Sequence, residues 1–258
     1  MKKFIKTLLG GFLINKIREN KNKVFPGKTY LHDKLLIEKS ISFYSNFIKT
    51  GDLCFDVGAN VGNKVQPLLA LKAKIVAIEP QESCHRILKM KFGNQITLIP
   101  YGLGEREEIK EFYISDSSTI SSFSNDWIDK VKKDRFKNNN WNVIQKIPVT
   151  TIDKLIEEKG IPVFIKIDVE GFELEVLKGL SVPIKMISFE YTVPEQTNQA
   201  IACIKRLYSI NPEIKCNYSV SDSMIYSLER WLIADEMIRF ISSDIFIESG
   251  FGDIYVKS

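Results

Sequence analysis

The chain lacks several features that often assign a protein to a class at first sight. Its 258 residues include four cysteines, which are widely spaced and form no Cys-x-x-Cys pair: Cys54, Cys84, Cys203 and Cys216. Neither a disulfide framework nor a zinc site is therefore expected, and reduced thiols are the default in a cytoplasmic protein. Internal repeats and long low-complexity tracts are missing too, and no apolar run is long enough to span a bilayer.

The composition fits a globular protein with a sizeable core. Hydrophobic residues make up 44% of the chain, which is enough for one large α/β domain or for one domain with an insertion. The net charge is +4 at pH 7. This mild basic excess permits an acidic or phosphorylated partner without requiring one.

The N-terminal segment has a distinct composition. Residues 1–28 carry eight Lys or Arg and one acid, Glu19, around the short apolar run F-I-K-T-L-L-G-G-F-L-I. That run is too short to cross a membrane, and no small-x-small cleavage site follows it. Two readings stay open: an amphipathic helix packed on the domain or on a second subunit, or a peripheral contact with an anionic membrane. We treat residues 1–50 as an N-terminal helical segment and 51–258 as the main domain.

Alternating apolar strands and helices predict the fold class. Such alternation is typical of a Rossmann-like, doubly wound α/β sheet, mostly parallel, with right-handed crossovers. A glycine-rich turn at 250–252 suggests that an antiparallel hairpin ends the sheet. Strands are predicted at 53–57, 74–78, 96–100, 163–168, 185–191, 215–219, 244–248 and 253–257, and helices at 32–49, 64–71, 83–92, 173–179 and 200–209.

The stretch from residue 104 to 149 interrupts this alternation. It is rich in Ser, Asn, Asp and Lys and contains S-D-S-S-T-I-S-S-F-S-N-D-W. A connection of this length inside a compact domain is usually functional or mobile. We expect a hairpin plus a lid or substrate-facing insertion, and the alternative is a surface loop without a catalytic role.

The turn F-D-V-G-A-N-V-G, residues 55–62, follows the first predicted strand and so faces the ligand crevice of such a sheet. Gly58 and Gly62 allow a tight turn, but Asn60 stands where a dinucleotide-binding turn has its middle glycine, and no P-loop Lys-Ser or Lys-Thr follows. Asp56 places a carboxylate beside the crevice, which suits an ammonium group and opposes a phosphate. These residues predict S-adenosylmethionine as the cofactor.

Two further strand ends are expected to hold the nucleoside part of this cofactor. Glu79, followed by Pro80, ends the second strand 17 residues after Gly62, where an acid can accept hydrogen bonds from ribose hydroxyls. Gly102 and Leu103 follow the third strand and are expected to border the adenine.

Three carboxylates are expected to meet at the same crevice. Asp168 ends the fourth strand, Glu170 follows in the turn, and Glu190 ends the neighbouring strand. Grouped carboxylates raise one another's pKa, which makes one of them a candidate base, and they offer oxygen ligands to a divalent cation. Lys166 shares a strand face with Asp168 and is expected to pair with the group.

For the acids at and just after the fourth predicted strand, a purely structural role is the alternative to a role in the site. Glu170 is in a position to cap the following helix instead of facing the crevice. The acids inside that helix, Glu173 and Glu175, are expected to be solvated.

With these motifs in view, the chain resembles the FkbM family of S-adenosylmethionine-dependent methyltransferases. The resemblance rests on G-D-L-C-F-D-V-G-A-N-V-G, I-V-A-I-E-P, I-P-V-T-T-I-D-K-L and above all F-I-K-I-D-V-E-G-F-E-L-E-V-L-K-G-L. It implies a class I methyltransferase fold and transfer of a methyl group to oxygen, on hydroxyls of polyketides or of sugars in bacterial surface glycans. It also implies cofactor contacts by Asp56, Gly58, Asn60 and Glu79, with Asp168, Glu170 and Glu190 around the reacting oxygen.

The resulting hypothesis is O-methylation of a carbohydrate hydroxyl, on a nucleotide- or lipid-linked sugar of a surface glycan or capsule. Alternatives are a lipid or polyketide-type acceptor, a nicotinamide-dependent dehydrogenase on the same fold, and a membrane-attached binding protein without chemistry. The [Asn/Asp/Ser]-Pro-Pro-aromatic tetrad of enzymes that methylate nucleic-acid bases is missing, so no nucleic-acid partner is expected. A homodimer is compatible with the sequence.

Overall fold

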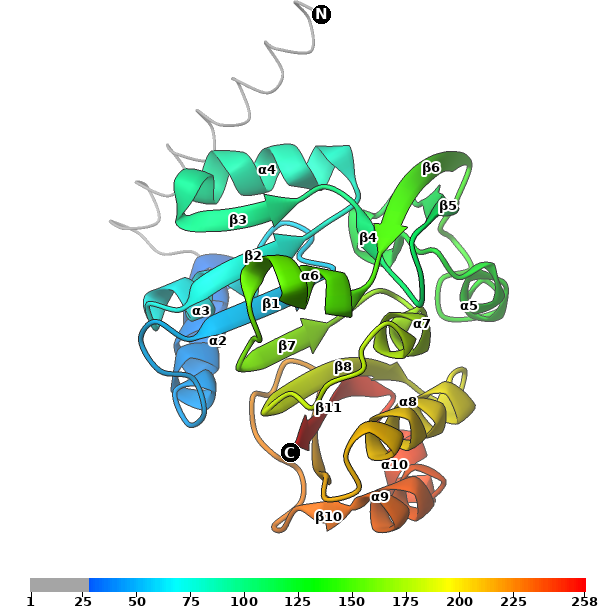
Figure 1. The fold of residues 1–258 in the computed structure, drawn as a ribbon. Coiled ribbons are helices and arrows are strands. Elements are labelled where there is room, and N and C mark those ends of the chain that lie inside the picture. The colour runs from blue at the N-terminus through cyan, green and yellow to red at the C-terminus, as the bar shows by residue number, and fades with distance from the viewer. Residues whose placement is uncertain (1–27) are drawn as a thin grey trace, which may run out of the picture.

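The centre of the fold is an eight-stranded sheet with helices on both faces (Figure 1). The computed structural model describes residues 28–258, with side chains from residue 34 onward, so the predicted basic, apolar segment at the N-terminus lies outside the described residues. Across the sheet the strands follow the order β10 (Leu232–Ile233), β9 (Lys215–Val220), β11 (Phe251–Lys257), β8 (Met186–Thr192), β7 (Phe164–Ile167), β1 (Leu53–Val57), β2 (Lys74–Ile78) and β3 (Ile96–Ile99).

Most of this sheet is parallel. Strands β3, β2, β1, β7 and β8 run in one direction, and β11 is inserted antiparallel between β8 and β9. The central strands β1, β2 and β7 are short, mostly apolar and almost completely buried, as expected where helices cover both faces. The prediction of a mostly parallel α/β sheet with antiparallel strands near its C-terminal end is confirmed.

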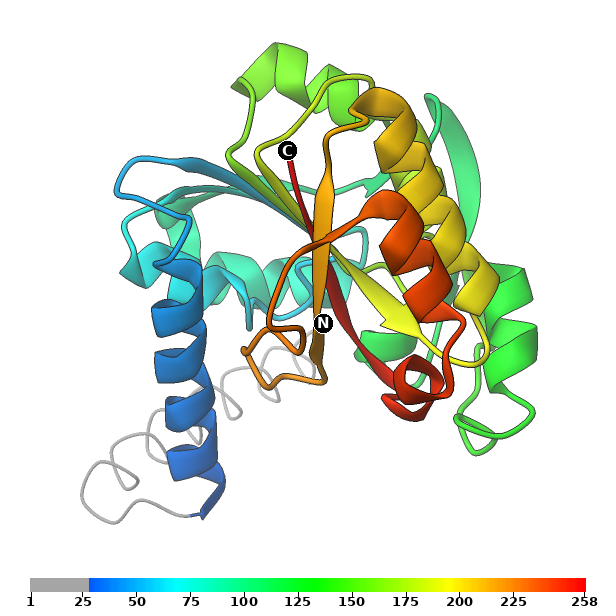
Figure 2. The same cartoon turned by 90° about the horizontal axis from the view of Figure 1, so that it is seen from below.

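Two sets of helices enclose the sheet, and Figure 2 shows α2 on one side with α8 and α9 on the other. Each set forms its own apolar core against the strands. No helix among residues 28–258 has both the length and the apolar character needed to cross a bilayer. One face carries α2 (Lys28–Tyr44), α3 (Val65–Ala70), α4 (Glu82–Phe92) and the short η1 (Gly93–Gln95); the other carries α6 (Ile152–Lys159), α7 (Glu173–Lys178), α8 (Thr197–Ile210), α9 (Ala234–Ile241) and α10 (Asp244–Glu248).

The predicted C-terminal hairpin is wrong in its details. Residues 244–248 form helix α10 instead of a strand, and Phe251 already belongs to β11, so no hairpin turn exists at 250–252. Ser243 starts the helix, because its side chain accepts a hydrogen bond from the backbone N–H of Phe246 at 3.4 Å. Phe246 is fully buried while Ile245 is 67% exposed. A short apolar run does not distinguish a strand from one turn of helix, which explains the error.

The insertion forms a second, small sheet beside the main one. Its strands are β4 (Gly102–Leu103), β6 (Val143–Thr150) and β5 (Glu108–Ile114), in that order. The antiparallel pair of β5 and β6 is the predicted hairpin, and its connection contains η2 (Ser118–Ile120) and α5 (Asn125–Val131). Trp127 and Trp141 are buried in a separate apolar cluster there. The connection is therefore packed on a core of its own.

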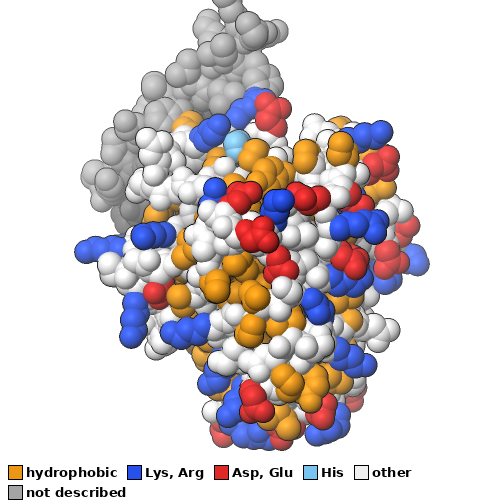
Figure 3. All heavy atoms as spheres, viewed as in Figure 1, with side chains coloured by type: hydrophobic (Ala, Val, Ile, Leu, Met, Phe, Trp, Pro, Cys, Tyr) orange, Lys and Arg blue, Asp and Glu red, His pale blue; other side chains and the backbone are white. Residues whose placement is uncertain are grey.

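The surface carries charges of both signs. On the face seen in Figure 3, lysine and arginine side chains are interspersed with aspartate and glutamate. This mixed pattern agrees with the small net charge of +4.

A close backbone contact joins the ends of β1 and β7. Gly58 has φ +84°, and a Cβ atom added there would lie 1.8 Å from the backbone oxygen of Asp168. The backbone N–H of Asp168 in turn donates to the oxygen of Val57 at 2.9 Å. Only glycine fits this position, which brings the turn after β1 next to the acidic turn after β7.

We predict that Gly58→Ala destabilises the protein more than Gly51→Ala does. Gly51 has a similar φ of +87° but has no atom within 4 Å of an added Cβ, so its substitution reports backbone strain alone, about 1–2 kcal/mol. The clash at Gly58 adds about 1–3 kcal/mol. Urea unfolding of the two variants measures the difference, and equal free energies of unfolding would contradict the close contact.

Candidate functional site

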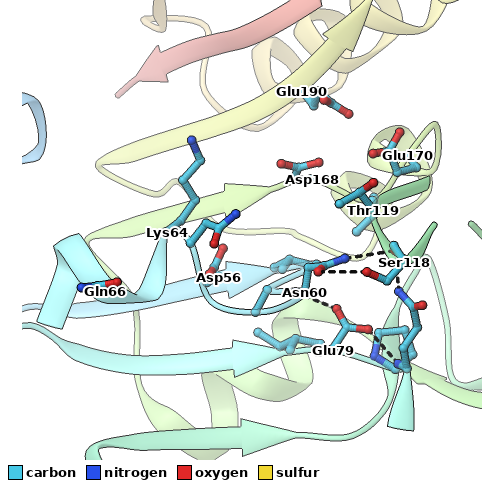
Figure 4. Close-up of a pocket in the computed structure, with 18 of the residues that line it drawn as sticks. Asp56, Asn60, Lys64, Gln66, Glu79, Ser118, Thr119, Asp168, Glu170 and Glu190 are labelled. Carbon is cyan, nitrogen blue, oxygen red and sulfur yellow. Dashed lines mark hydrogen bonds between the residues drawn. The ribbon is translucent and has the colours of Figure 1, made fainter. Parts of the chain in front are cut away.

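A large cavity opens at the carboxyl ends of β1, β2, β7 and β8 (Figure 4). Its volume is about 1190 Å³. Gly62 is not part of its wall, because it packs beneath Leu88 and Phe92. The other residues predicted for the site all line the cavity: Asp56, Gly58, Asn60, Glu79, Pro80, Gly102, Leu103, Asp168, Glu170 and Glu190.

Glu79 holds the turn after β1 against the end of β2. Its carboxylate accepts hydrogen bonds from the backbone N–H groups of Asn60, at 2.8 Å, and Gln81, at 2.7 Å. The side chain is almost completely buried, and this burial raises its pKa to about 7 although the two N–H donors oppose the shift. Asn60 has φ +45°, a conformation that asparagine tolerates better than most residues. The sequence predicted Glu79 as a ligand contact but not as the support of the turn.

Asp56 is a buried carboxylate on the cavity wall. It is 2% exposed, and its Oδ2 has no hydrogen-bond partner among the described residues. Burial raises its pKa to about 7, which Lys166 partly opposes. A buried carboxylate oxygen without a donor is costly. A cationic donor that enters the cavity would remove that cost.

One part of the insertion, residues 115–122, forms a section of the cavity wall, and we call it the serine segment. The backbone oxygen of Ser118 accepts hydrogen bonds from the side chains of Asn60, at 3.0 Å, and Gln81, at 2.9 Å. The hydroxyl of Ser122 donates to the backbone oxygen of Glu170 at 2.6 Å. The serine segment therefore contacts both the turn after β1 and the turn after β7, a role that its sequence does not specify.

The three predicted acids do meet in the cavity. Each of Asp168, Glu170 and Glu190 has an oxygen within 4.8 Å of those of the other two, and all three are half-buried. Burial, followed by the nearby Asp168 carboxylate, raises the pKa of Glu170 and of Glu190 well above the usual range. Both shifts favour the protonated form of these side chains relative to an exposed glutamate.

Lys166 lies beneath this group and pairs with it, as predicted. Its side chain is 1% exposed, and its ammonium donates to Asp168 at 3.2 Å and to Asp253 at 2.7 Å. Asp253 comes from the antiparallel strand β11, where it lies opposite Glu190. Sequence inspection missed Asp253 because 87 residues separate it from Lys166.

The expectation that Glu173 is solvated is wrong. This residue is 1% exposed, and its Oε1 accepts hydrogen bonds from the backbone N–H groups of Val169, at 3.1 Å, and Gly171, at 3.2 Å. It thereby closes the turn that carries Glu170, whose side chain faces the cavity. Glu175 is partly exposed and accepts a hydrogen bond from Lys178 at 2.7 Å.

The carboxylate group has oxygen ligands at the spacing of a cation site. One of its members, Asp168, already has the buried ammonium of Lys166 as its counter-charge. The arrangement fits proton transfer, and we assign no cation to it.

The chain is similar in sequence and in fold to several known methyltransferases. The chain is 29% identical over 141 residues to the hexuronic acid methyltransferase AglP of Haloferax volcanii, and it spans about half of that relative, 54% of each chain. Similar folds include a precorrin-6y C5,15-methyltransferase from Geobacter metallireducens (9% identity, TM-score 0.45, 86% of each chain). Another is a TehB-like SAM-dependent methyltransferase from Corynebacterium glutamicum (8% identity, TM-score 0.43, 95% of each chain).

A family model covers most of the chain. It is described as the methyltransferase FkbM domain and matches residues 56–230. The matched range begins at Asp56 and contains Glu79, the insertion and the three cavity carboxylates. The chain therefore belongs to the FkbM family of methyltransferases.

Proposed function

We propose that the protein transfers a methyl group from S-adenosylmethionine to a hydroxyl oxygen of a carbohydrate. The observation that carries this proposal is the shared cavity, in which unpartnered Asp56 faces the same space as the three carboxylates. Asp56 supplies a partner for an ammonium group, and the carboxylates supply partners for a hydroxyl proton.

The residues around Asp56 fit such a cofactor. The carboxylate of Glu79 already accepts two backbone N–H groups, but each oxygen has a second lone pair for a ribose hydroxyl. Gly102 and Leu103 offer a backbone edge and an apolar surface for an adenine ring. When bound, this cofactor supplies an electrophilic methyl group.

The acidic residues prepare the acceptor oxygen. In the proposed reaction a hydroxyl donates a hydrogen bond to Asp168, which would take up its proton as the oxygen gains the methyl group and the methyl–sulfur bond breaks. Glu170, whose raised pKa favours its protonated form, would hold the acceptor by a hydrogen bond. Lys166 fixes one oxygen of Asp168 at 3.2 Å, so the carboxylate presents a defined direction to the acceptor. Most of the rate then comes from positioning.

The chemistry of the cavity favours a neutral polyol as the acceptor. Acidic side chains at the reacting end disfavour a carboxylate or phosphate placed there, whereas they exchange hydrogen bonds with hydroxyls. The hydroxyls of Ser118 and Thr119 lie on the same wall. The relative AglP carries a name that specifies a sugar acid, which supports a carbohydrate acceptor here, on a nucleotide- or lipid-linked sugar.

We predict that Asp168→Asn lowers turnover by about a hundredfold or more, because removal of a general base costs about 10²–10⁴ in rate. The affinity for S-adenosylhomocysteine should stay within a few-fold of wild type. Methyl transfer to an acceptor drawn from a panel of nucleotide sugars, glycan fragments, lipids and polyketides measures turnover. Glu175→Gln, which alters an acid outside the cavity lining, is the control. Full turnover in the Asp168 variant would remove it from the mechanism.

Cofactor affinity should depend on pH. Because burial raises the pKa of Asp56 and of Glu79 to about 7, both carboxyls take up protons as the pH falls through neutrality. A protonated Asp56 no longer attracts an ammonium, so the Kd for S-adenosylhomocysteine should rise by up to about tenfold per pH unit below pH 7. Calorimetric titrations at pH 6, 7 and 8 measure this. Asp56→Asn should bind more weakly at pH 8 and show a shallower pH dependence, and a flat wild-type profile would contradict the assignment.

Chelation should leave turnover unchanged, because the ammonium of Lys166 already supplies a counter-charge to Asp168. The measurement compares methyl transfer with and without EDTA. Loss of activity that Mg²⁺ or Mn²⁺ restores would assign a cation to Asp168, Glu170 and Glu190 instead.

A further inference from the structure

The amino-acid end of S-adenosylmethionine is a zwitterion, with one ammonium and one carboxylate group. The residues assigned so far include a partner for the ammonium group but none for the carboxylate. Asp56 suits the ammonium, while the carboxylate still needs a cationic donor. We propose that Lys64 binds this carboxylate, so that Asp56 and Lys64 together form a zwitterion-binding subsite. The inference rests on the proposed function, since it takes S-adenosylmethionine as the ligand.

The position of Lys64 follows from the turn after β1. It directly precedes α3, whose buried Val65 and Pro67 fix the start of the helix against the core. The Lys64 side chain is 19% exposed and lines the cavity, and Figure 4 shows it beside Asp56. The two opposite charges therefore lie on one part of the cavity wall.

Lys64 keeps its charge in this position and has donors to spare. Burial alone would lower its pKa, but Tyr44, Asp253 and Asp222 together raise it above the usual range. Among the described residues, its ammonium makes one hydrogen bond, to Asp222 at 2.6 Å. Two of its three N–H donors thus remain for a ligand. Asp222 also lines the cavity, so its carboxylate competes with an incoming anion for Lys64.

Two other lysines near the cavity are less suited to the task. Lys166 is enclosed between Asp168 and Asp253 and is 1% exposed. Lys91 lies on α4, where its ammonium donates to the backbone oxygen of Val61 at 2.8 Å, and its side chain is exposed, so water competes with a ligand for it.

The order of groups along the edge of the sheet matches the order of groups in the ligand. Gly102 and Leu103 form β4, shortly after the end of β3, and Glu79 follows the end of β2. Asp56 lies near the end of β1, and Lys64 follows the turn after that strand. This sequence of an apolar surface, an acid for hydroxyls, an acid for an ammonium and a lysine corresponds to adenine, ribose and amino acid.

Two ligands that differ only at the amino-acid end test the proposal. S-adenosylhomocysteine carries the ammonium and carboxylate, whereas 5′-methylthioadenosine has the same nucleoside and thioether without them. Calorimetry on the full-length protein should show that Lys64→Met raises the Kd for S-adenosylhomocysteine about ten- to a hundredfold. The Kd for 5′-methylthioadenosine should change less than about threefold. Lys64→Arg should retain most of the affinity.

Two further variants serve as controls. Lys89→Met removes the same charge from the exposed surface of α4 and should leave both affinities unchanged. Asp222→Asn removes the carboxylate that competes for Lys64 and should bind S-adenosylhomocysteine at least as tightly as wild type.

Four results would overturn the proposal. In Lys64→Met these are equal weakening of both ligands or no weakening of either. The others are a loss of affinity in Asp222→Asn equal to that in Lys64→Met, and equal affinity of the wild type for 5′-methylthioadenosine and S-adenosylhomocysteine. If wild type binds neither ligand, the proposed cofactor itself fails, and that outcome is distinct from a failure of Lys64 alone.

Discussion

The buried ammonium of Lys166 is the interaction on which the arrangement of the site depends. A charge with 1% of its side chain exposed costs several kcal/mol unless it is paired, and here it is shared by Asp168 and Asp253. The first partner lies at the end of a parallel strand and the second on the antiparallel strand β11. Asp253 reaches Lys166 because β11 lies next to β8 in the sheet. The order of the strands therefore helps to fix the orientation of the Asp168 carboxylate, which pairs with the same ammonium.

The same principle explains why the insertion is part of the site. Buried polar groups need partners, and several polar groups around the cavity find theirs in the serine segment. Ser118 receives hydrogen bonds from Asn60 and Gln81, and Ser122 donates to the backbone of Glu170. Movement of this segment would break contacts on both sides of the cavity. The insertion thus forms a wall shared by the turn after β1 and the acidic turn after β7.

The sequence predicted those parts of the site that lie close to one another along the chain. The turn at 55–62, the strand end at Glu79 and the block around Asp168 all follow from short apolar strands that end in polar residues. The partners of these residues were not predictable, because Asp253 and Ser118 come from distant segments whose side chains carry no local signal. The prediction that Glu173 is solvated was wrong for a related reason. An acid at the start of a helix is usually exposed, but here two backbone N–H groups of the preceding turn donate to its carboxylate, which is buried.

In the proposed reaction the methyl group is transferred to a hydroxyl oxygen. The position of the methyl group in the product tests this most directly. Incubation with methyl-labelled S-adenosylmethionine and neutral, acidic and amino sugars, followed by NMR of the labelled product, gives that position. A methyl ether on a sugar hydroxyl is the predicted result. A methyl ester on a sugar carboxylate, or a methyl group on nitrogen, would contradict the roles given to Asp168, Glu170 and Glu190.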